Sequence, residues 1–468
     1  MTHEPRDEYD AVVIGGGIAG AAAALALADA GRRVTLVESR ARLGGLAFSF
    51  RRGELTVDNG QHVHLRCCTA YRRLLERIGG AGLAPVQERL DVPVLDAGHP
   101  RGPRLGRLRR TALPVPLHLA GSLAGYPHLP PSDRARVARA ALALRTLDPS
   151  DPALDTTDFG TWLRDQGQSP RAVEALWDLV GRATLNATAS QVSLGLAAMV
   201  FRTGLLSEPG AADIGWSRAP LGDLHDTLTR AALDRAGAVT RLRTRVTEIK
   251  RTAEGRWQVG CASGPHGSEQ SLETRTVVLA VPQHEAHALL PEGVLDDPGR
   301  LLGIGTAPIL NVHVVYDRRV LRRPFFAALG TPVQWVFDRT APSGLAGGGQ
   351  YLALSQSAVQ DEIDEPVAVL RNRYVPELER LLPAARGAQV RDFFVTRERN
   401  ATFAPAPGVG RLRPAGRTRA PGFFLAGAWT DTGWPATMEG AVRSGLHAAD
   451  AALRDLGRPH DHPLQEAV

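Results

Sequence analysis

The 468-residue chain is short of cysteine and lysine, and each shortage excludes a class of protein. Three cysteines cannot build a disulfide framework, and two of them, Cys67 and Cys68, are adjacent residues that seldom bridge each other. Because Lys250 is the only lysine, the net charge of +6 rests on arginines spread over a large chain. No groove-like pattern of lysine and aromatic residues indicates nucleic-acid binding.

Long apolar runs and metal-ligand clusters are missing too. No uninterrupted apolar stretch reaches the roughly 18 residues of a membrane-spanning helix, so we expect no transmembrane segment. His62 and His64 alternate as on a strand and have no third candidate ligand, so we expect no metal site. The polar start at residues 1–7 and the scarcity of cysteine favour a cytoplasmic protein without a signal peptide.

A dinucleotide-binding fingerprint occupies residues 10–38. An apolar, strand-like run enters the turn Gly15-Gly-Gly17-Ile-Ala-Gly20, and an alanine-rich, helix-like run follows it. Gly15 allows a tight turn, Gly17 lets the backbone approach a pyrophosphate, and the helix that Gly20 opens attracts this anion to its amino terminus. Glu38 ends the next strand, where an acid accepts a hydrogen bond from a ribose hydroxyl, which disfavours NADP.

Two further glycine segments indicate a flavin rather than a nicotinamide. Gly44 and Gly45 follow the acidic residue and would let a second backbone loop pass close to the dinucleotide. Residues 423–445 read as a buried strand, a glycine turn at Gly427 and a helix start near Met438. Backbone N–H groups of that turn could face the flavin pyrimidine ring, where negative charge grows on reduction.

In their order along the chain, these segments resemble the amine-oxidase and phytoene-desaturase superfamily of FAD enzymes. The resemblance covers nearly the whole chain and includes the strand-like residues 277–282 between the two ends. It implies FAD as the cofactor and a backbone contact between Val246 and the adenine. It also implies that Gly60, Gln61 and His62 lie beside the flavin ring.

Two positions depart from the pattern of many relatives. Leu46 stands where an arginine often follows the glycine pair, so that Arg40 or Arg42 is the candidate for the phosphate contact. Ala428 stands where an acid often follows the last glycine turn, and Asp431 is its candidate substitute. The predicted FAD-binding residues are Gly15, Gly17, Gly20, Glu38, Arg40, Arg42, Gly44, Gly45, Gly60, Val246, Gly427, Asp431, Thr437 and Met438.

We expect an α/β fold with two lobes and a loose tail over 456–468. A Rossmann-like FAD-binding lobe is assembled from discontinuous segments, with a helix over 221–236 and a strand over 239–250 in the second of them. These FAD segments are 8–90, 215–292 and 395–455. An α+β substrate lobe with a helical insertion after Ser132 takes the remaining segments, which are 91–214 and 293–394.

The stretch from Ala97 to Ser132 contains no Asp or Glu. Several arginines lead there into an apolar segment broken by proline, a composition that suits an anionic membrane surface. On this interpretation, residues 101–131 attach the protein peripherally to the inner face of the plasma membrane. The alternative is an arginine-lined loop that feeds a buried hairpin of the substrate lobe.

Two motifs indicate one branch of the superfamily. Amine oxidases carry a lysine in the substrate lobe and an aromatic residue before the Met-Glu-Gly run, whereas Lys250 lies in the FAD lobe and Thr437 precedes Met438. Residues 58–62, Asp-Asn-Gly-Gln-His, and the run 432–445 instead resemble the squalene-associated branch, which contains hydroxysqualene dehydroxylase of bacterial hopanoid biosynthesis. The resemblance implies reductive dehydroxylation of hydroxysqualene, a C30 isoprenoid, to squalene.

Two other functions remain open from the sequence. A carotenoid desaturase of the phytoene type would use the same fold and move hydride in the opposite direction. A flavin- or lipid-binding protein without turnover is the non-enzyme alternative, which Leu46 and Ala428 keep open. Since the chain has one dinucleotide fingerprint, electrons for FAD would come from a partner reductase or from transiently bound NAD(P)H.

Removing an allylic hydroxyl requires a proton donor and an apolar cavity. His62 is the first candidate for the general acid because imidazole titrates near neutrality, and Gln61 could orient the hydroxyl. A structural hydrogen bond from His62 to the loop backbone is the competing interpretation, and Asp58 is expected to stabilise the turn. The predicted channel residues, for which core packing is the alternative, are Tyr316, Trp335, Phe337 and Trp434.

Overall fold

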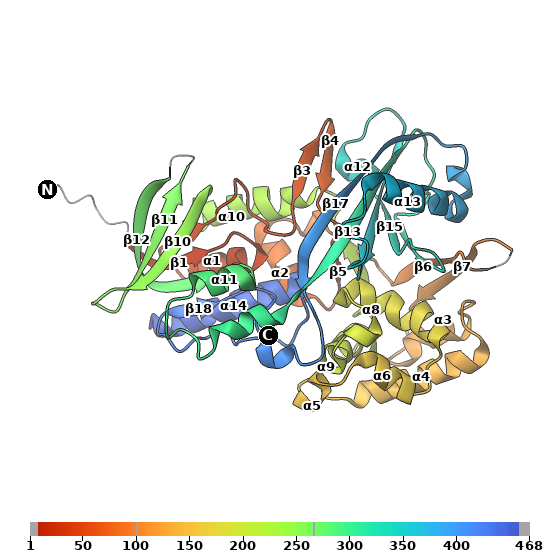
Figure 1. Cartoon of the computed structure of the whole chain (residues 1–468), viewed down its shortest axis with the longest axis horizontal. Helices are drawn as coiled ribbons and strands as arrows, with labels where there is room; N and C mark the ends of the chain where they lie inside the picture. Colours follow the sequence, from red (N-terminus) through yellow and green to blue (C-terminus); the bar gives the residue numbers. More distant parts are fainter. Residues whose placement is uncertain (1–7, 100, 265–266, 458–468) are drawn as a thin grey trace.

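The computed structural model describes residues 8–99, 101–264 and 267–457, which form two lobes side by side (Figure 1). Each lobe has its own seven-stranded sheet, and helices cover both sheets, so the predicted α/β fold class is confirmed. Within these ranges no helix is long and apolar enough to cross a membrane. The polar start at 1–7 and almost all of the predicted tail lie outside the described residues.

The first sheet has a parallel centre and an antiparallel edge. Strands β18, β12, β1, β2 and β9 run parallel in that order, and β11 and then β10 extend from the amino-terminal half of β12 as antiparallel strands. Residues 11–14 and all of β2 are buried, and all of them except Thr35 are apolar, as expected for parallel strands covered on both faces. The strands are β1 (Glu8–Ile14), β2 (Val34–Val37), β9 (Val239–Arg241), β10 (Thr244–Arg251), β11 (Trp257–Ser263), β12 (Ser268–Leu279) and β18 (Phe423–Leu425).

Small residues bring two helices close together beside this sheet. α1 (Ile18–Asp29) is buried along almost its whole length and packs on β1, β2 and α14 (Met438–Asp455). A Cβ atom at Gly445 would lie 2.1 Å from the carbonyl oxygen of Ala19, so only glycine lets the two helix backbones approach this closely. The other helices of this lobe are α2 (Thr69–Ile78), a helix over 221–235 that ends in α10 (Thr229–Arg235), and α11 (Gln283–Leu289).

Two predicted boundaries are wrong. The single strand expected over 239–250 is two strands, because Arg243 adopts φ +53° and turns the chain between β9 and β10. The third FAD segment does not begin at 395, since β17 (Val390–Phe403) pairs with the second sheet up to its last residue. Residues 396–402, all polar except Ala401, give no strand pattern in the sequence, because β17 is an edge strand and much of its length is exposed to the cavity or to solvent.

The second sheet forms the substrate lobe and has the order β17-β13-β16-β15-β14-β6-β7. Its central strands are buried on both faces, and α13 (Val367–Leu381) covers one face of the sheet. The remaining strands are β13 (Thr306–Tyr316), β16 (Gln350–Ser357), β15 (Trp335–Asp338), β14 (Phe325–Leu329), β6 (Asp91–Asp96) and β7 (Arg104–Arg109). Segment 101–131, which the sequence assigns either to membrane contact or to an arginine-lined loop with a hairpin, thus contains β7, one strand of a hairpin.

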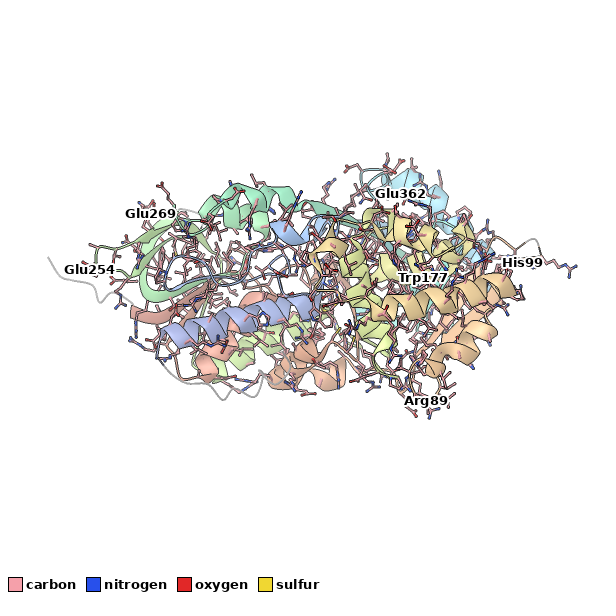
Figure 2. The ribbon with its side chains drawn as sticks, turned by 90° about the horizontal axis from the view of Figure 1, so that it is seen from below. Arg89, His99, Trp177, Glu254, Glu269 and Glu362 are labelled. Atoms are coloured by element: carbon pink, nitrogen blue, oxygen red, sulfur yellow. The ribbon has the colours of Figure 1, made fainter. Side chains whose placement is uncertain are left out.

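A helical insertion follows β7, as predicted from the residues after Ser132. Trp177 is buried where it packs edge-on against Phe159 and Phe201, while charged residues such as Arg89 and Glu269 lie exposed at the outside of the molecule (Figure 2). The helices are α3 (Ala120–Ala124), α4 (Pro131–Thr146), α5 (Pro152–Asp155), α6 (Phe159–Asp165), α7 (Pro170–Ala172), α8 (Asp178–Leu185) and α9 (Leu194–Phe201), with π-helical turns at Val173–Trp177 and Arg202–Leu206.

Two short sheets lie where the lobes meet. β3 (Ser49–Arg52) and β4 (Leu55–Asp58) form a hairpin, and β5 (Val63–Leu65) pairs with β8 (Ile214–Trp216). The loop between β4 and β5 is the Asp-Asn-Gly-Gln-His motif of the sequence. This arrangement brings the motif to the interface of the two lobes.

Candidate functional site

The first glycine loop is shaped by close backbone contacts. Gly15 has φ +105°, and a Cβ atom there would lie 2.4 Å from the carbonyl oxygen of Ala280. A Cβ atom at Gly20 would lie 1.9 Å from the carbonyl oxygen of Gly15, so Gly20 serves packing between the turn and α1. Gly17 is the N-cap of α1 without a side-chain cap, and it lines a cavity of about 1260 Å³. Its position at a helix amino terminus suits an anion such as a pyrophosphate.

The second glycine loop lies directly against the first. Gly45 has φ +57°, and a Cβ atom there would lie 2.9 Å from the Cα atom of Gly17. Arg40 lines the cavity beside these glycines. Arg42 instead donates to the carbonyl oxygens of Leu43 and Gly45, and its guanidinium lies 3.4 Å from the ring centre of Phe48. Arg40 is therefore the better placed of the two arginines for a phosphate, and Arg42 holds the loop.

Glu38 and Val246 lie at the end of the cavity expected to hold the adenosine. The Glu38 carboxylate accepts from the backbone N–H groups of Gly16 at 2.7 Å and Arg40 at 2.7 Å. It is buried, lines the cavity and keeps lone pairs for a ribose hydroxyl. Val246 lines the same end, next to a bulge in β10.

The carboxyl-terminal loop closes the cavity from the other side. Gly427, Thr437, Met438 and Trp434 all line the cavity, and the Thr437 side chain caps α14 by accepting from the backbone of Gly440 at 3.0 Å. Asp431, the candidate substitute for an acid at 428, is exposed and accepts from the backbone N–H of Gly433 at 3.3 Å. Its contacts belong to a turn at the surface.

Arg413, which the sequence analysis missed, holds this carboxyl-terminal loop. Its buried guanidinium donates to four carbonyl oxygens of the loop, those of Ala428, Trp429, Thr430 and Trp434. Burial lowers the pKa of Arg413 to about 10, which leaves it charged at neutral pH. No local motif surrounds Arg413, because its partners lie 15 to 21 residues further along the chain.

Glu439 lines the cavity and also joins two helices. Its buried carboxylate accepts from the backbone of Ala70 at 3.1 Å and Tyr71 at 2.7 Å in the first turn of α2, and from Arg443 at 2.7 Å. A carboxylate at a helix amino terminus is stabilised by the unpaired N–H groups and the helix dipole. The sequence analysis did not find this role because the two helices are more than 360 residues apart.

Beyond these loops the cavity continues into the substrate lobe between apolar walls. The helical insertion contributes Val137, Leu179 and Leu206, and the second sheet contributes Phe325, Trp335 and Phe337. Tyr316 does not belong to this channel, so this prediction is wrong. It is fully buried among the residues packed between the second sheet and α13, because β13 carries it past the end of the cavity.

The flavin-side loop supplies the polar groups at the junction between the nucleotide end and the apolar end. Gly60, Gln61 and His62 all line the cavity. The Nδ1 atom of His62 lies 3.2 Å from the Gly60 carbonyl oxygen, which is the loop hydrogen bond of the competing interpretation. Burial lowers the pKa of His62 below its ordinary value of 6.5, so the imidazole is mainly neutral at pH 7.

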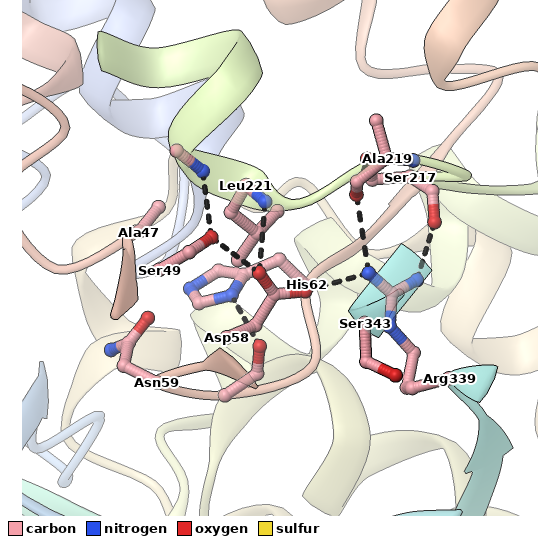
Figure 3. Close-up of polar contacts among 12 residues, drawn as sticks. Ala47, Ser49, Asp58, Asn59, His62, Ser217, Ala219, Leu221, Arg339 and Ser343 are labelled. Atoms are coloured by element: carbon pink, nitrogen blue, oxygen red, sulfur yellow. Dashed lines mark hydrogen bonds and ion pairs between the residues drawn. The ribbon is translucent and has the colours of Figure 1, made fainter. Parts of the chain in front are cut away.

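A buried ion pair holds this loop in place (Figure 3). The Asp58 carboxylate accepts from Arg339 at 2.6 Å, and both side chains are almost inaccessible to solvent. Asp58 also accepts from the Ser49 hydroxyl at 2.6 Å and from the backbone of Leu221 at 2.9 Å. Arg339 donates in addition to the carbonyl oxygens of Ser217 and Ala219. Asp58 therefore acts structurally, and its partner comes from the substrate lobe.

Comparison with known proteins assigns the family. A sequence model described as flavin containing amine oxidoreductase matches residues 18–453. The chain belongs to this family. It is an FAD-dependent oxidoreductase, which removes the alternative of a flavin- or lipid-binding protein without turnover. The glycine cradle of Gly17 and Gly45 and the helix amino terminus beside it fit the pyrophosphate of FAD.

Individual relatives extend along nearly all of the chain. It is 29% identical to a hydroxysqualene dehydroxylase of Sinorhizobium fredii over 95% of this chain and 98% of that protein. It is 25% identical to a zeta-carotene desaturase of Synechocystis over 97% and 98%, respectively. A triple mutant of putrescine oxidase has the same fold, with a TM-score of 0.73 at 19% identity over 96% of this chain and all of that one.

Proposed function

We propose that this FAD enzyme reductively removes the hydroxyl group of hydroxysqualene to form squalene, in hopanoid or other triterpene biosynthesis. The observation that carries the proposal is the cavity, in which the flavin-side motif at 58–62 opens directly into a large apolar chamber. A linear C30 chain needs such a chamber because its burial is driven by the removal of apolar surface from water. The dehydroxylase relatives support the same choice of substrate.

The reaction breaks an allylic C–O bond, and the oxygen leaves as water after taking up a proton. When reduced FAD is bound, it supplies the hydride that forms the new C–H bond. The side chains of Val137, Leu179 and Leu206 keep water away from the developing allylic cation. The ring faces of Phe325, Trp335 and Phe337 surround the same space and can stabilise positive charge.

The flavin-side loop would handle the leaving oxygen. Gln61 carries an amide N–H₂ group into the cavity, where it can donate to the hydroxyl. With Nδ1–H donating to the Gly60 carbonyl, neutral His62 has an accepting Nε2 atom, so proton donation requires the imidazolium form. Electrons for FAD come in this proposal from a separate reductase, because the chain has one dinucleotide fingerprint.

A carotenoid desaturase is the second candidate, and the zeta-carotene desaturase relative is the observation in its favour. Both reactions need an apolar chamber, but they run in opposite redox directions. A desaturase takes hydride from a hydrocarbon and has no hydroxyl group to bind. The polar loop at the flavin end of the chamber favours the dehydroxylase.

The deciding experiment is anaerobic. Purified holoenzyme is reduced with dithionite, mixed with hydroxysqualene in detergent, and followed by flavin absorbance and lipid extraction. We expect squalene to form in step with flavin reoxidation. Reduced flavin that stays reduced beside unchanged hydroxysqualene would overturn the proposal, and oxidation of zeta-carotene or phytoene by the oxidised enzyme would establish the desaturase instead.

We further propose that the mouth of the chamber rests on an anionic membrane. Leu117 and Leu142 line the cavity and are 53% and 50% exposed, so they lie where it opens to the surface. Leu105 and Leu113 in the segment 101–131 are exposed as well. Such leucines would enter the headgroup region and let an apolar substrate pass from the bilayer into the chamber.

Charge contributes less to this membrane contact than the sequence indicates. Arg107 and Arg109 pair with Asp91, and Arg110 pairs with the buried Asp213. Because Arg107 and Arg109 share one carboxylate and Arg66 also pairs with Asp213, these ion pairs compensate only part of the positive charge, and attachment depends on the leucines as well. The ion pairs of Arg107, Arg109 and Arg110 therefore fit the alternative given for residues 101–131, in which the arginines belong to a loop that feeds a hairpin.

Flotation with anionic liposomes tests the surface. We expect the wild type to float with the vesicles, and the double variant Leu113→Asp/Leu117→Asp to stay in solution. Leu302→Asp is the matched control, because Leu302 is 58% exposed and lies outside segment 101–131. Failure of the wild type to float at low salt, or equal flotation of both variants, would remove the membrane proposal.

A further inference from the structure

Two buried polar atoms at the flavin-side loop have no hydrogen-bond partner among the described residues. They are the Nε2 atom of Gln61 and the Oδ1 atom of Asn311. Both residues line the cavity at the point where the loop meets β13. Because a buried polar group without a partner is costly, such atoms in a cavity wall indicate a ligand.

The orientation of the Asn311 amide is fixed by its other end. Its Nδ2 atom donates to the carbonyl oxygen of Asn59 at 3.1 Å, and turning the amide over would set two oxygens against each other. A Cβ atom at Gly60 would lie 3.1 Å from this Nδ2 atom, so glycine at 60 lets the loop lie directly on the amide. Asn311 is fully buried, and its accepting oxygen is left beside the loop.

Neighbouring groups cannot turn to satisfy these atoms, because their own hydrogen bonds are complete. The Asn59 side chain donates to Leu46 and Glu398 and accepts from the backbone of Phe48. The Asn59 carbonyl accepts from Asn311 and, at 2.7 Å, from the Thr396 hydroxyl. The loop is thus held rigidly on the second sheet.

We infer that Asn311 and Gln61 together bind the hydroxyl group of the substrate. The Oδ1 atom of Asn311 accepts a hydrogen bond from the hydroxyl group, and the Nε2 atom of Gln61 donates a hydrogen bond to the hydroxyl oxygen. An alcohol offers both a donor and an acceptor, whereas a hydrocarbon offers neither. This inference rests on the proposed function and adds to it a site that selects an alcohol at the flavin end of the chamber.

The two residues would also orient the bond that breaks. Holding the oxygen at the loop leaves the allylic carbon directed toward the flavin side of the cavity. The N–H of Gln61 stays on the oxygen as the C–O bond lengthens and negative charge grows there, so its hydrogen bond strengthens. Asn311 binds the hydroxyl before the bond breaks and sets its direction.

Binding to oxidised holoenzyme tests the site without turnover. Hydroxysqualene and squalene are titrated separately in detergent, and the change in flavin absorbance gives each Kd. We expect the wild type to bind hydroxysqualene roughly ten- to a hundredfold more tightly than squalene, and Asn311→Leu to lower this ratio by about three- to tenfold at an unchanged Kd for squalene. Gln61→Met, on the half-buried loop, should lower the ratio similarly and serves if Asn311→Leu does not fold.

Thr396→Val is the matched control. It removes the hydrogen bonds of the Thr396 hydroxyl to the Asn59 carbonyl and to His313 but leaves both unpartnered atoms in place, so we expect the wild-type ratio. A wild-type ratio near one, or a ratio that neither Asn311→Leu nor Gln61→Met changes, would overturn the inference. If either of these results came with squalene formation in the anaerobic assay, only the inference about Asn311 and Gln61 would fail, and the proposed function would remain. If the ratio of the two Kd values depended on Asn311 but no squalene formed, the alcohol-binding site would remain and the proposed dehydroxylation would be overturned.

Discussion

The dinucleotide end of the cavity is formed by backbone at glycine residues, whereas the flavin-side and substrate ends are formed by side chains from distant segments. Gly17 and Gly45 touch through their main chains, and both belong to the first 45 residues. Asp58, Asn311 and Arg339 meet at the other end from three widely separated parts of the chain. A local motif can therefore specify the first end, while the second depends on how the two lobes pack.

The largest expected effect comes from breaking the link between the lobes. Arg339→Met leaves the buried Asp58 carboxylate without its ion-pair partner, and we expect the free energy of unfolding to fall by about 3–5 kcal/mol. Urea denaturation of the holoenzyme measures it. The double variant Asp58→Leu/Arg339→Met removes both charges and should recover part of the loss. A fall below about 1 kcal/mol in the single variant would show that the pair does not hold the lobes together.

The backbone end can be tested with two matched glycines. Gly45→Ala strains a residue at φ +57° and places a Cβ atom 2.9 Å from the Cα atom of Gly17. We expect the affinity for FAD to fall by about 1–3 kcal/mol, measured by fluorescence titration of the apoprotein. Gly53→Ala has a similar φ of +55° with no atom within 4 Å, and it should leave FAD binding unchanged. Equal FAD affinity in both variants would contradict the role of Gly45.

The side-chain end can be tested through its pH dependence. Burial lowers the pKa of His62 below 6.5, so the imidazolium fraction falls about tenfold for each pH unit above that lowered pKa. If His62 is the general acid, kcat/KM for dehydroxylation rises as the pH is lowered from 8 toward 5.5, and we expect this rise. His62→Gln should abolish the acid-side rise. Superimposable profiles of the two proteins would exclude His62 as the acid.

The smallest expected effect concerns the buried histidines around the loop. Burial lowers the pKa of His313 and of His225 to about 3, so both are neutral in the folded protein and protonate more readily when it unfolds. The stability they contribute is present above pH 6.5 and is lost as the pH falls from 6.5 toward 3. His313→Gln should reduce the pH slope of the unfolding free energy by at most about 1.4 kcal/mol per pH unit. Urea denaturation at pH 7 and 5 measures it, and an unchanged slope would contradict the prediction.

Much of the nucleotide end could be predicted from the sequence because its signals are short and contiguous. Gly15, Gly44 and Gly45 adopt backbone conformations that only glycine adopts easily, and Gly20 leaves the space that the turn needs. The fold class followed from the same segments. Arg42 was the exception among these residues, since its guanidinium binds loop carbonyls beside Phe48. The direction of a long side chain depends on neighbours that a motif does not contain.

The substrate end was predicted less completely. Trp335 and Phe337 line the chamber as expected, but Tyr316, on a strand of the same sheet, is buried in the core. Alternation along a strand does not say how far the cavity extends along it. Asn311 and Arg413 were missed because a lone polar residue in an apolar strand or loop carries no signal until its partners are known.

The sequence by itself determined the cofactor and the fold, because a pyrophosphate is bound by the backbone of one local turn and helix. Only the tertiary structure decided which polar side chains face the chamber, which arginines of the basic stretch form ion pairs, and which atoms remain without partners among the described residues. These properties depend on atoms brought together from residues hundreds of positions apart, such as Asp58 and Arg339. Hydrogen bonds and ion pairs act over a few ångströms in space, and sequence spacing does not measure that distance.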